Sequence, residues 1–505
     1  MPDLSKLFTT TVADERVVSI NASRLVPPTA RPHFALRDVA VGAAVLVACA
    51  LFIFVDGATM PIVRWDESRN MVNALEMRAS GWSVVTTYGG HPDLWNTKPP
   101  LAIWAMTLST RLFGATEWAL RLPSLLATLA TLTLVMAFVR RVSGTMIPAA
   151  GAAAMLALSP GFFGEHAART ADYDAPLIFF TTLCALALFD VLHGRRPRVA
   201  LAIAAAAGAA ALMTKGIAGA MPLAGVAVYA AAVGRTRRLL RPRVLAAAVA
   251  AALPLATWLM LREAAGAGFA AATWRNDVGG RYAHSLIGDA KPAGFYLHQL
   301  AAGYLAGLPL LLAAPLSWRL GARRRERLAI GFALCVAMTQ LAIVSAAASK
   351  LSHYLLPALP FAAIAAALGT GALARRLPRW PVVALVAIVM IVAAERAGTI
   401  RYRLEPAGEW RGAGLYGSLL AALPPGEVAV WEPAAPIEDQ QHYVPELAAY
   451  RLIWAERGIA ARQVVREAEI GDAPLVASCD PAIVATLRQR GPDVAGVAGC
   501  VAIAR

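Results

Sequence analysis

Charged residues are scarce in this sequence. They make up 16% of its 505 residues, while 58% are hydrophobic. A soluble globular protein has about 25% charged and roughly 45–50% apolar residues. This shortage excludes an ordinary soluble domain and indicates a membrane protein. Acidic residues are the scarcer kind, with 32 Asp and Glu against 47 Lys and Arg and a formal net charge of +15. Because the basic residues form short runs between apolar segments, this excess indicates membrane topology rather than nucleic-acid binding.

Cysteine is also scarce, and no Cys/His combination has the spacing of a metal site. Three of the five cysteines lie in apolar segments and are expected to be inert small hydrophobic residues. Cys479 and Cys500 lie in a polar C-terminal region, where an extracytoplasmic location would permit a disulfide between them. A cleaved signal peptide is not expected, because the first apolar run begins near Val39 and leads into a charged loop.

Apolar segments follow one another along most of the chain. A helix needs about 20 apolar residues to cross a bilayer, and about eleven segments approach that length. We therefore predict a polytopic α-helical membrane protein. The segments are 39–55, 118–139, 146–163, 176–192, 199–213, 217–233, 244–261, 295–316, 328–346, 354–373 and 381–394.

The loops between these segments alternate in charge. Basic clusters occur in the N-terminal tail 1–38 and in the loops at 140–141, 195–198, 235–243, 319–327 and 375–376. The positive-inside rule assigns this side to the cytoplasm. The opposite side receives three long segments, which are 56–117, 264–294 and 395–505. Functional chemistry is expected on loops held by a rigid scaffold, so we look for it there.

The chain divides into a transmembrane module, 39–394, and a C-terminal region, 395–505, of different character. Strand-like patterns occur at 427–431, 474–478 and 501–504, and a helical pattern occurs at 481–489. These patterns predict a small extracytoplasmic α/β domain.

The first long outward segment carries candidate catalytic residues. Asp66 and Glu67 directly follow Trp65 just past a membrane segment. Acids are common in the first turn of a helix, but an acid near the bilayer surface is also a candidate general base. Lys98 precedes Pro99-Pro100, which fix the chain at a rigid corner. This lysine is either an interfacial side chain or a ligand for a lipid phosphate.

Three shorter outward turns carry further ionisable residues. Each turn taken singly is equally well explained as an ordinary interfacial loop. Ionisable groups between apolar segments are costly unless they face a wet cavity, and the convergence of these turns on one side favours a shared site. The candidates are Arg169, Asp174, Lys215, His353 and Tyr354.

Six short motifs occur in an order that resembles one known group of enzymes. Together they are similar to the aminoarabinose-transferase and protein O-mannosyltransferase-like group of GT-C glycosyltransferases, over roughly 58–360. The motifs are Asp66-Glu67, Lys98-Pro99-Pro100-Leu101, Arg121-Leu122-Pro123-Ser124, Asp174-Ala175-Pro176, Thr214-Lys215-Gly216 and Tyr354-Leu355-Leu356-Pro357.

The resemblance implies a GT-C enzyme of the bacterial inner membrane with an extracytoplasmic active site. It would move a sugar, with inversion, from a polyprenyl-phosphate donor to lipid A, a polysaccharide or a protein. The resemblance makes Asp66 the catalytic base and Asp174 the second acid of the site. It also makes Lys98, Lys215 and Tyr354 ligands of the lipid phosphate, with Arg281 at the position of a loop arginine.

Two departures from the group bear on metal binding. Thr97 stands where many relatives have an acid, and Asn276-Asp277 stand where relatives often carry His or Glu. We therefore expect no metal between these positions. The sequence requires no cofactor, although a divalent metal elsewhere stays open.

Two other functions share some of these features. A lipid-linked-sugar transporter or flippase would have similar apolar segments but helices broken near the bilayer midplane. An inactive relative could act as a scaffold through its C-terminal domain. The gathering of charges at one interface, with both acids and both lysines present, favours the enzyme.

Overall fold

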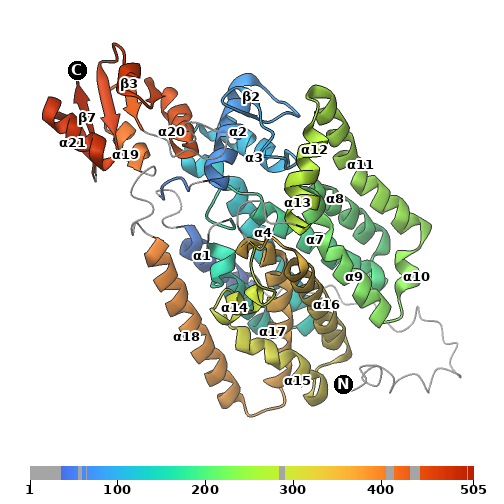
Figure 1. Cartoon of the computed structure of the whole chain (residues 1–505). Coiled ribbons are helices and arrows are strands. Elements are labelled where there is room, and N and C mark those ends of the chain that lie inside the picture. Colours follow the sequence, from blue (N-terminus) through green and yellow to red (C-terminus); the bar gives the residue numbers. More distant parts are fainter. Residues whose placement is uncertain are drawn as a thin grey trace, which may run out of the picture.

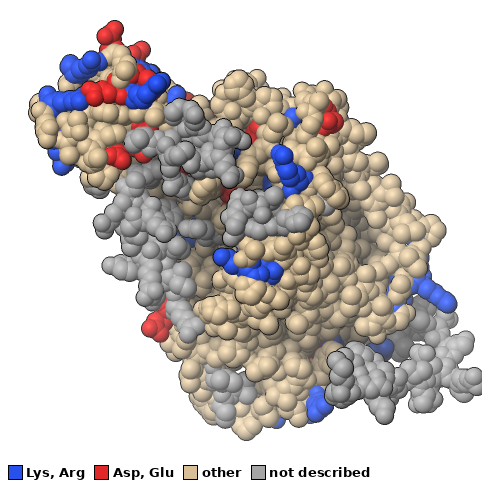
Figure 2. Space-filling model, viewed as in Figure 1, with Lys and Arg blue, Asp and Glu red and all other residues tan. Residues whose placement is uncertain are grey.

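The computed structural model describes residues 36–54, 60–63, 65–164, 166–283, 290–404, 415–432, 444–497 and 499–505. A bundle of helices forms most of the molecule, and a small sheet with its own helices sits at one end (Figure 1). Figure 2 shows acidic and basic side chains gathered on that sheet, whereas the visible face of the bundle is largely uncharged. Such a surface suits a lipid environment.

Seven helical stretches within the described residues are long and apolar enough to cross a membrane. Their composition confirms a polytopic helical membrane protein. They are α1 (Leu36–Phe54), α4 (Glu117–Ser143), α7 (Asp174–Leu192), α8 to α9 (Pro197–Ala232), α11 (Pro242–Ala265), α16 (Arg324–Ala346) and η5 with α17 (Ser352–Leu373).

Each of the eleven predicted segments overlaps a helix, but some of these helices are short. The shorter ones include α5 (Met146–Ala157), α6 (Pro160–Phe163) and the apolar part of α18 (Arg379–Leu404). The stretch Pro197–Ala232 contains α8 (Pro197–Lys215), η2 (Gly216–Ala220) and α9 (Met221–Ala232), and Gly216 at its bend has a φ of 55°. The number of helices that cross the bilayer therefore stays a prediction.

The prediction of one continuous span over 295–316 is wrong. Instead, α14 (Phe295–Ala301) ends early, and η4 (Leu308–Leu312) and α15 (Ala313–Leu320) follow after an irregular connection. Gly303 and Gly307 in this connection have φ values of 97° and 66°, which favour glycine and end a helix. Pro309 then lacks the amide that would continue the preceding turn. Hydropathy alone does not detect such breaks.

The segment predicted as a loop over 56–117 contains two helices. One is α2 (Asp66–Ser80), and the other is the apolar α3 (Leu101–Phe113), which starts directly after Pro100. A short hairpin of β1 (Thr87–Tyr88) and β2 (His91–Pro92) lies between them. The second long segment folds into α12 (Phe269–Thr273), the π-helix η3 (Trp274–Val278) and α13 (Gly279–Ala283).

The C-terminal part forms a five-stranded sheet in the order β4-β3-β5-β7-β6. Strands β4, β3 and β5 are parallel, and β7 is antiparallel to both β5 and β6. A disulfide joins Cys479 to Cys500. The elements are α19 (Leu415–Ala421), β3 (Gly426–Trp431), α20 (Pro445–Ala455), β4 (Ile459–Val464), β5 (Leu475–Ser478), α21 (Pro481–Arg490), β6 (Asp493–Val497) and β7 (Cys500–Ala504).

Basic loops gather at the end of the bundle away from this sheet. Arg141 and Arg195 both pair with Asp190 near the end of α7, and Arg235 donates to the carbonyl of Leu192. In Figure 1, α10 (Thr236–Leu239) and α15 lie at this end, opposite α2 and the C-terminal sheet. These loops lie on one side, as expected. The N-terminal tail up to residue 35 lies outside the described residues, and the assignment of this side to the cytoplasm stays a prediction.

Candidate functional site

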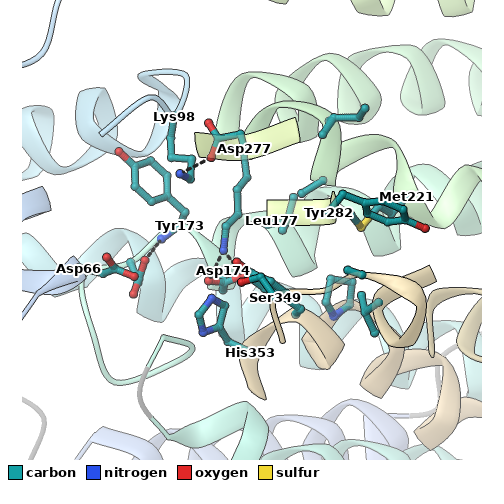
Figure 3. Close-up of a pocket in the computed structure, with 18 of the residues that line it drawn as sticks. Asp66, Lys98, Tyr173, Asp174, Leu177, Met221, Asp277, Tyr282, Ser349 and His353 are labelled. Carbon is teal, nitrogen blue, oxygen red and sulfur yellow. Dashed lines mark hydrogen bonds and ion pairs between the residues drawn. The ribbon is translucent and has the colours of Figure 1, made fainter. Parts of the chain in front are cut away.

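A cavity of about 550 Å³ opens beside the start of α2. Its walls come from the first outward segment, α7, η2, η3, α13, α16 and η5. Figure 3 shows Asp66, Asp174 and His353 turned toward one space, with Lys98 and Asp277 close by and Leu177, Met221 and Tyr282 farther along the wall. Six residues predicted from the sequence line it, namely Asp66, Lys98, Asp174, Lys215, His353 and Tyr354.

Asp66 is the most accessible acid of the cavity. It is the first residue of α2, and its side chain is 55% exposed. The helix dipole stabilises a carboxylate at this end. Trp65 before it has a φ of 71°, a strained conformation for a non-glycine residue that directs the chain into the helix. The carboxylate of Asp66 can therefore meet a substrate in the cavity.

Asp174 and Lys215 form a buried ion pair. The Nζ atom of Lys215 lies 2.8 and 2.6 Å from the two carboxylate oxygens of Asp174. Asp174 begins α7 and Lys215 ends α8, so each charge sits at the helix end whose dipole favours it. Both predicted residues are thus in the cavity, and each neutralises the other.

Lys98 is also paired with an acid. Its Nζ lies 2.6 Å from Oδ1 of Asp277, which is carried by η3, and Thr97 donates to the same carboxylate. At the positions where the sequence led us to expect no metal, the structure has an ion pair between a lysine and a carboxylate. Asp277 was noted in the sequence only as a departure from the group, because nothing local indicates a partner 179 residues away.

His166 is a residue of the site that sequence reasoning missed. Its Nδ1 lies 2.7 Å from Oδ2 of Asp172 and 3.6 Å from Oδ2 of Asp66, and its ring centroid lies 4.2 Å from that of His353, with the two ring planes tilted by 39°. Burial lowers the pKa of His166, but the charge of Asp172, with Asp66 and Asp174, raises it to about 9. Burial raises the pKa of Asp172, yet His166 holds it below its ordinary value. His166 is therefore a cation among acids near neutral pH.

The same residues could hold a metal ion. Candidate ligand atoms of Asp66, His166 and Asp172 lie within 4.8 Å of one another, as do those of His166, Asp174 and His353. Mixed imidazole and carboxylate donors suit zinc or manganese. A cation bound there would replace the proton of His166 as the counter-charge to the acids.

Two predicted residues, Glu67 and Arg169, do not line the cavity, and a third, Arg281, lies partly outside the described residues. Glu67 is buried, with both oxygens bonded by Arg121 at 2.7 and 2.9 Å, so it cannot reach a substrate, and its predicted catalytic role is not supported. Arg169 is buried away from the cavity surface. The backbone of Arg281 lies in α13, but its side chain lies outside the described residues.

A polar network that the sequence did not reveal forms one wall. The side-chain amide of Asn96 donates to Asn73, Tyr173 and Asn70 at 2.8, 2.9 and 3.2 Å. Asn70 and Asn96 line the cavity, and the network fixes the first outward segment against the start of α7. Asparagines give no strong sequence signal of function, so only their convergence in space indicates this role.

Comparisons with known proteins agree with this fold. The family described as dolichyl-phosphate-mannose-protein mannosyltransferase matches residues 97–260. ArnT from Cupriavidus metallidurans, solved bound to undecaprenyl phosphate and in the apo state, superposes with TM-scores of 0.62 and 0.63 at 20% identity. Each superposition covers 92% of this chain, and 97% and 98% of the ArnT chains. The chain therefore has the fold of ArnT, and part of it is similar to the mannosyltransferase family.

Two curated proteins are similar to this chain in sequence. An undecaprenyl phosphate-alpha-4-amino-4-deoxy-L-arabinose arabinosyl transferase of Pseudomonas savastanoi is 28% identical over 338 residues, or 65% of this chain. An uncharacterised protein of Aquifex aeolicus is 29% identical over 304 residues, or 59% of the chain. The matches span 60% and 58% of these two relatives. These matches support the resemblance that the six motifs indicate.

Proposed function

We propose that this chain is a glycosyltransferase that moves a sugar from a polyprenyl-phosphate donor to an extracytoplasmic acceptor. The observation that carries the proposal is the composition of the cavity. One accessible carboxylate, Asp66, faces two lysines, Lys98 and Lys215, and the cavity continues along an apolar wall. The carboxylate suits the role of a base, and the lysines suit a lipid phosphate. The apolar wall suits the first isoprene units of the lipid.

The reaction joins the acceptor oxygen to the anomeric carbon of the sugar. Asp66 takes the proton of the attacking hydroxyl, and the bond between that carbon and the phosphate oxygen breaks. The leaving phosphate gains negative charge, which Lys98 and Lys215 stabilise. Each ammonium has three N–H donors, so it can bond the phosphate while it keeps its carboxylate partner. With Asp66 opposite the leaving group, direct displacement inverts the anomeric carbon.

The acceptor and the side of the membrane belong to the same proposal. The cavity is lined by residues at the start of α2, and α2 lies at the end of the molecule that carries the C-terminal sheet, opposite α10 and α15 (Figure 1). The positive-inside rule would place this end outside the cytoplasm of a bacterial inner membrane. Lipid A, a polysaccharide and a protein hydroxyl all offer the required nucleophile there.

The transporter alternative predicts that broken helices surround the substrate. The break between α14 and η4 lies away from the cavity, since no described residue from 295 to 320 lines it, whereas Lys215 and Ile217 beside the bend at Gly216 do line it. The ionisable residues instead lie at helix ends and turns, as an enzyme at the membrane surface would need. The break between α14 and η4 therefore gives no support to transport through this cavity.

The proposal is tested with membranes supplied with labelled lipid-linked sugar. We expect Asp66→Asn to lower turnover roughly 100-fold or more through loss of the base. Lys98→Ala should lower it about 100-fold through loss of one charge on the leaving phosphate. Lys291→Ala and Asp493→Asn, which change exposed residues outside the cavity, are matched controls that should keep full activity. Full turnover by both cavity variants would refute the assignment.

A further inference from the structure

The C-terminal unit, 415–432 and 444–505, packs directly against the helix that begins with Asp66. Helix α20 lies beside α2 in Figure 1, and Arg78 of α2 pairs with Glu456 just after α20. Tyr450 of α20 is 2% exposed, and its hydroxyl accepts a hydrogen bond of 3.0 Å from the backbone amide of Ile62. Ile62 stands four residues before Asp66.

Glu67 and Arg121 connect the segment that Tyr450 contacts to the residues of the cavity. Glu67 accepts from the amide of Val63 at 2.7 Å, next to Ile62, and from the amide of Ala171 at 2.8 Å. Arg121 binds both oxygens of Glu67 and also donates to the carbonyls of residues 60 and 61, at 2.7 and 2.9 Å. One buried ion pair thus joins the segment before Asp66 to the turn that carries Asp172 and Asp174.

Stability alone is a poor explanation for this pair. Glu67 and Arg121 are 1% and 0% exposed, and a buried ion pair often stabilises a fold no better than apolar residues of the same volume. Its paired, parallel hydrogen bonds do fix orientation more strictly than apolar contacts. The ion pair is therefore suited to fix the distance between the segment before Asp66 and the turn that carries Asp172 and Asp174.

The ring of Tyr450 also packs closely against α19. A Cβ atom on Gly417 of α19 would lie 2.4 Å from the Tyr450 ring, so glycine permits this close approach. Burial also raises the pKa of Tyr450 above its ordinary value, so its hydroxyl is neutral. The ring is a fixed link between the C-terminal core and the segment before Asp66.

We propose that Tyr450 is a positioning residue, through which the C-terminal unit and the Glu67–Arg121 pair hold Asp66 at a fixed distance from the Asp172–Asp174 turn. The C-terminal unit is then a structural part of the active site rather than a separate acceptor-binding module. The kinetic consequence rests on the proposed function, whereas the structural link does not.

Two Tyr→Phe variants test this role in the complete protein. Tyr450→Phe removes the hydroxyl that reaches Ile62. Tyr416→Phe removes another buried hydroxyl of the same unit, whose partners Glu432 and the amide of Cys479 lie within that unit. Misplacement of a catalytic group by about 1 Å can cost 100-fold in rate, so we expect kcat of Tyr450→Phe to fall about tenfold. The KM for the donor should stay within about twofold, and Tyr416→Phe should keep the wild-type kcat.

Hydrogen exchange measured by mass spectrometry gives a readout independent of activity. Tyr450→Phe should speed exchange in peptides covering 60–70 and 166–174, and Tyr416→Phe should not. Unchanged exchange in Tyr450→Phe, or an equal loss of kcat in both variants, would overturn the proposal. Faster exchange at both segments, together with a wild type that transfers no lipid-linked sugar, would uphold the link while refuting the proposed function.

Discussion

At the residue scale, the charges of the site work as pairs. Sequence reasoning placed Lys98, Asp174 and Lys215 together, and the structure agrees. It did not find that Asp277 is the partner of Lys98, or that Lys215 and Asp174 neutralise each other, because partners far apart in sequence leave no local pattern. Glu67 lies outside the cavity for a geometric reason. Neighbours on a helix point about 100° apart, so Glu67 faces the protein interior while Asp66 faces the cavity.

Removing one member of the buried pair of Lys215 and Asp174 should lower both stability and ligand binding. Lys215→Met leaves the buried carboxylate of Asp174 without its cation, which we expect to cost about 3–5 kcal/mol of stability. It should also weaken binding of polyprenyl phosphate. Adding Asp174→Asn should restore most of the stability but not the binding. Thermal unfolding in detergent and a lipid-phosphate binding assay measure both effects, and a single variant with wild-type stability and binding would remove Lys215 from the site.

His166 should make stability depend on pH. Its pKa is raised from about 6.5 in the unfolded chain to about 9 in the fold. The stability it contributes is therefore fully present below about pH 6.5 and is lost as the pH rises through 9. We expect the unfolding temperature to fall between pH 7 and 9.5 more steeply in the wild type than in His166→Asn. Equal slopes for the two proteins would show that His166 is not charged in the fold.

At the element scale, hydropathy predicted which segments are helical but not where they break. Each predicted apolar segment overlaps a helix, yet the segment 295–316 is interrupted by glycines with positive φ. Helix α3 was counted as loop because its 13 residues are short for a membrane span. Strands β4 and β6 were missed because Arg462 and Gln463 in one, and Asp493 and Gly496 in the other, weaken a strand pattern.

The helices that form the apolar wall depend on close backbone contact. A Cβ atom added to Gly225 of α9 would lie 2.5 Å from Cα of Val336 in α16, so these helices would have to separate. We expect Gly225→Ala to cost about 1–3 kcal/mol and to weaken donor binding, because Met221 and Gln340 on these two helices line the cavity. Gly151→Ala, where nothing lies within 4 Å, is the control and should be stable. The comparison uses thermal unfolding in detergent, where equal stability of the two variants would contradict the packing.

At the scale of the whole molecule, the arrangement has two chemically different ends. Helix α2, which borders the cavity, and the C-terminal sheet lie at one end, and α10 and α15, beside the arginine-rich loops, lie at the other (Figure 1). The sequence predicted this polarity because charge alternation depends only on the order of loops and apolar segments. It could not predict that the C-terminal unit shares a hydrophobic core with α2 and α3, since that contact joins residues nearly 400 positions apart.

The disulfide offers a test of this polarity. Cys479 and Cys500 are bonded, and a disulfide persists outside the cytoplasm but is reduced inside it. We expect maleimide to label these cysteines in denatured protein only after reduction. Reduction should lower the stability of the C-terminal unit by about 3 kcal/mol, since the two cysteines are 21 positions apart in the sequence. Labelling without reductant in protein taken directly from cells would place this unit in the cytoplasm.

The most direct test of the central claim is mass spectrometry of envelope extracts from a strain that lacks this chain. The strain would be complemented with either the wild type or Asp66→Asn. The wild type should yield a glycosylated acceptor, whereas Asp66→Asn should leave the acceptor unmodified and accumulate polyprenyl-phosphate sugar. A glycosylated acceptor at wild-type amounts with Asp66→Asn would contradict transfer at this cavity.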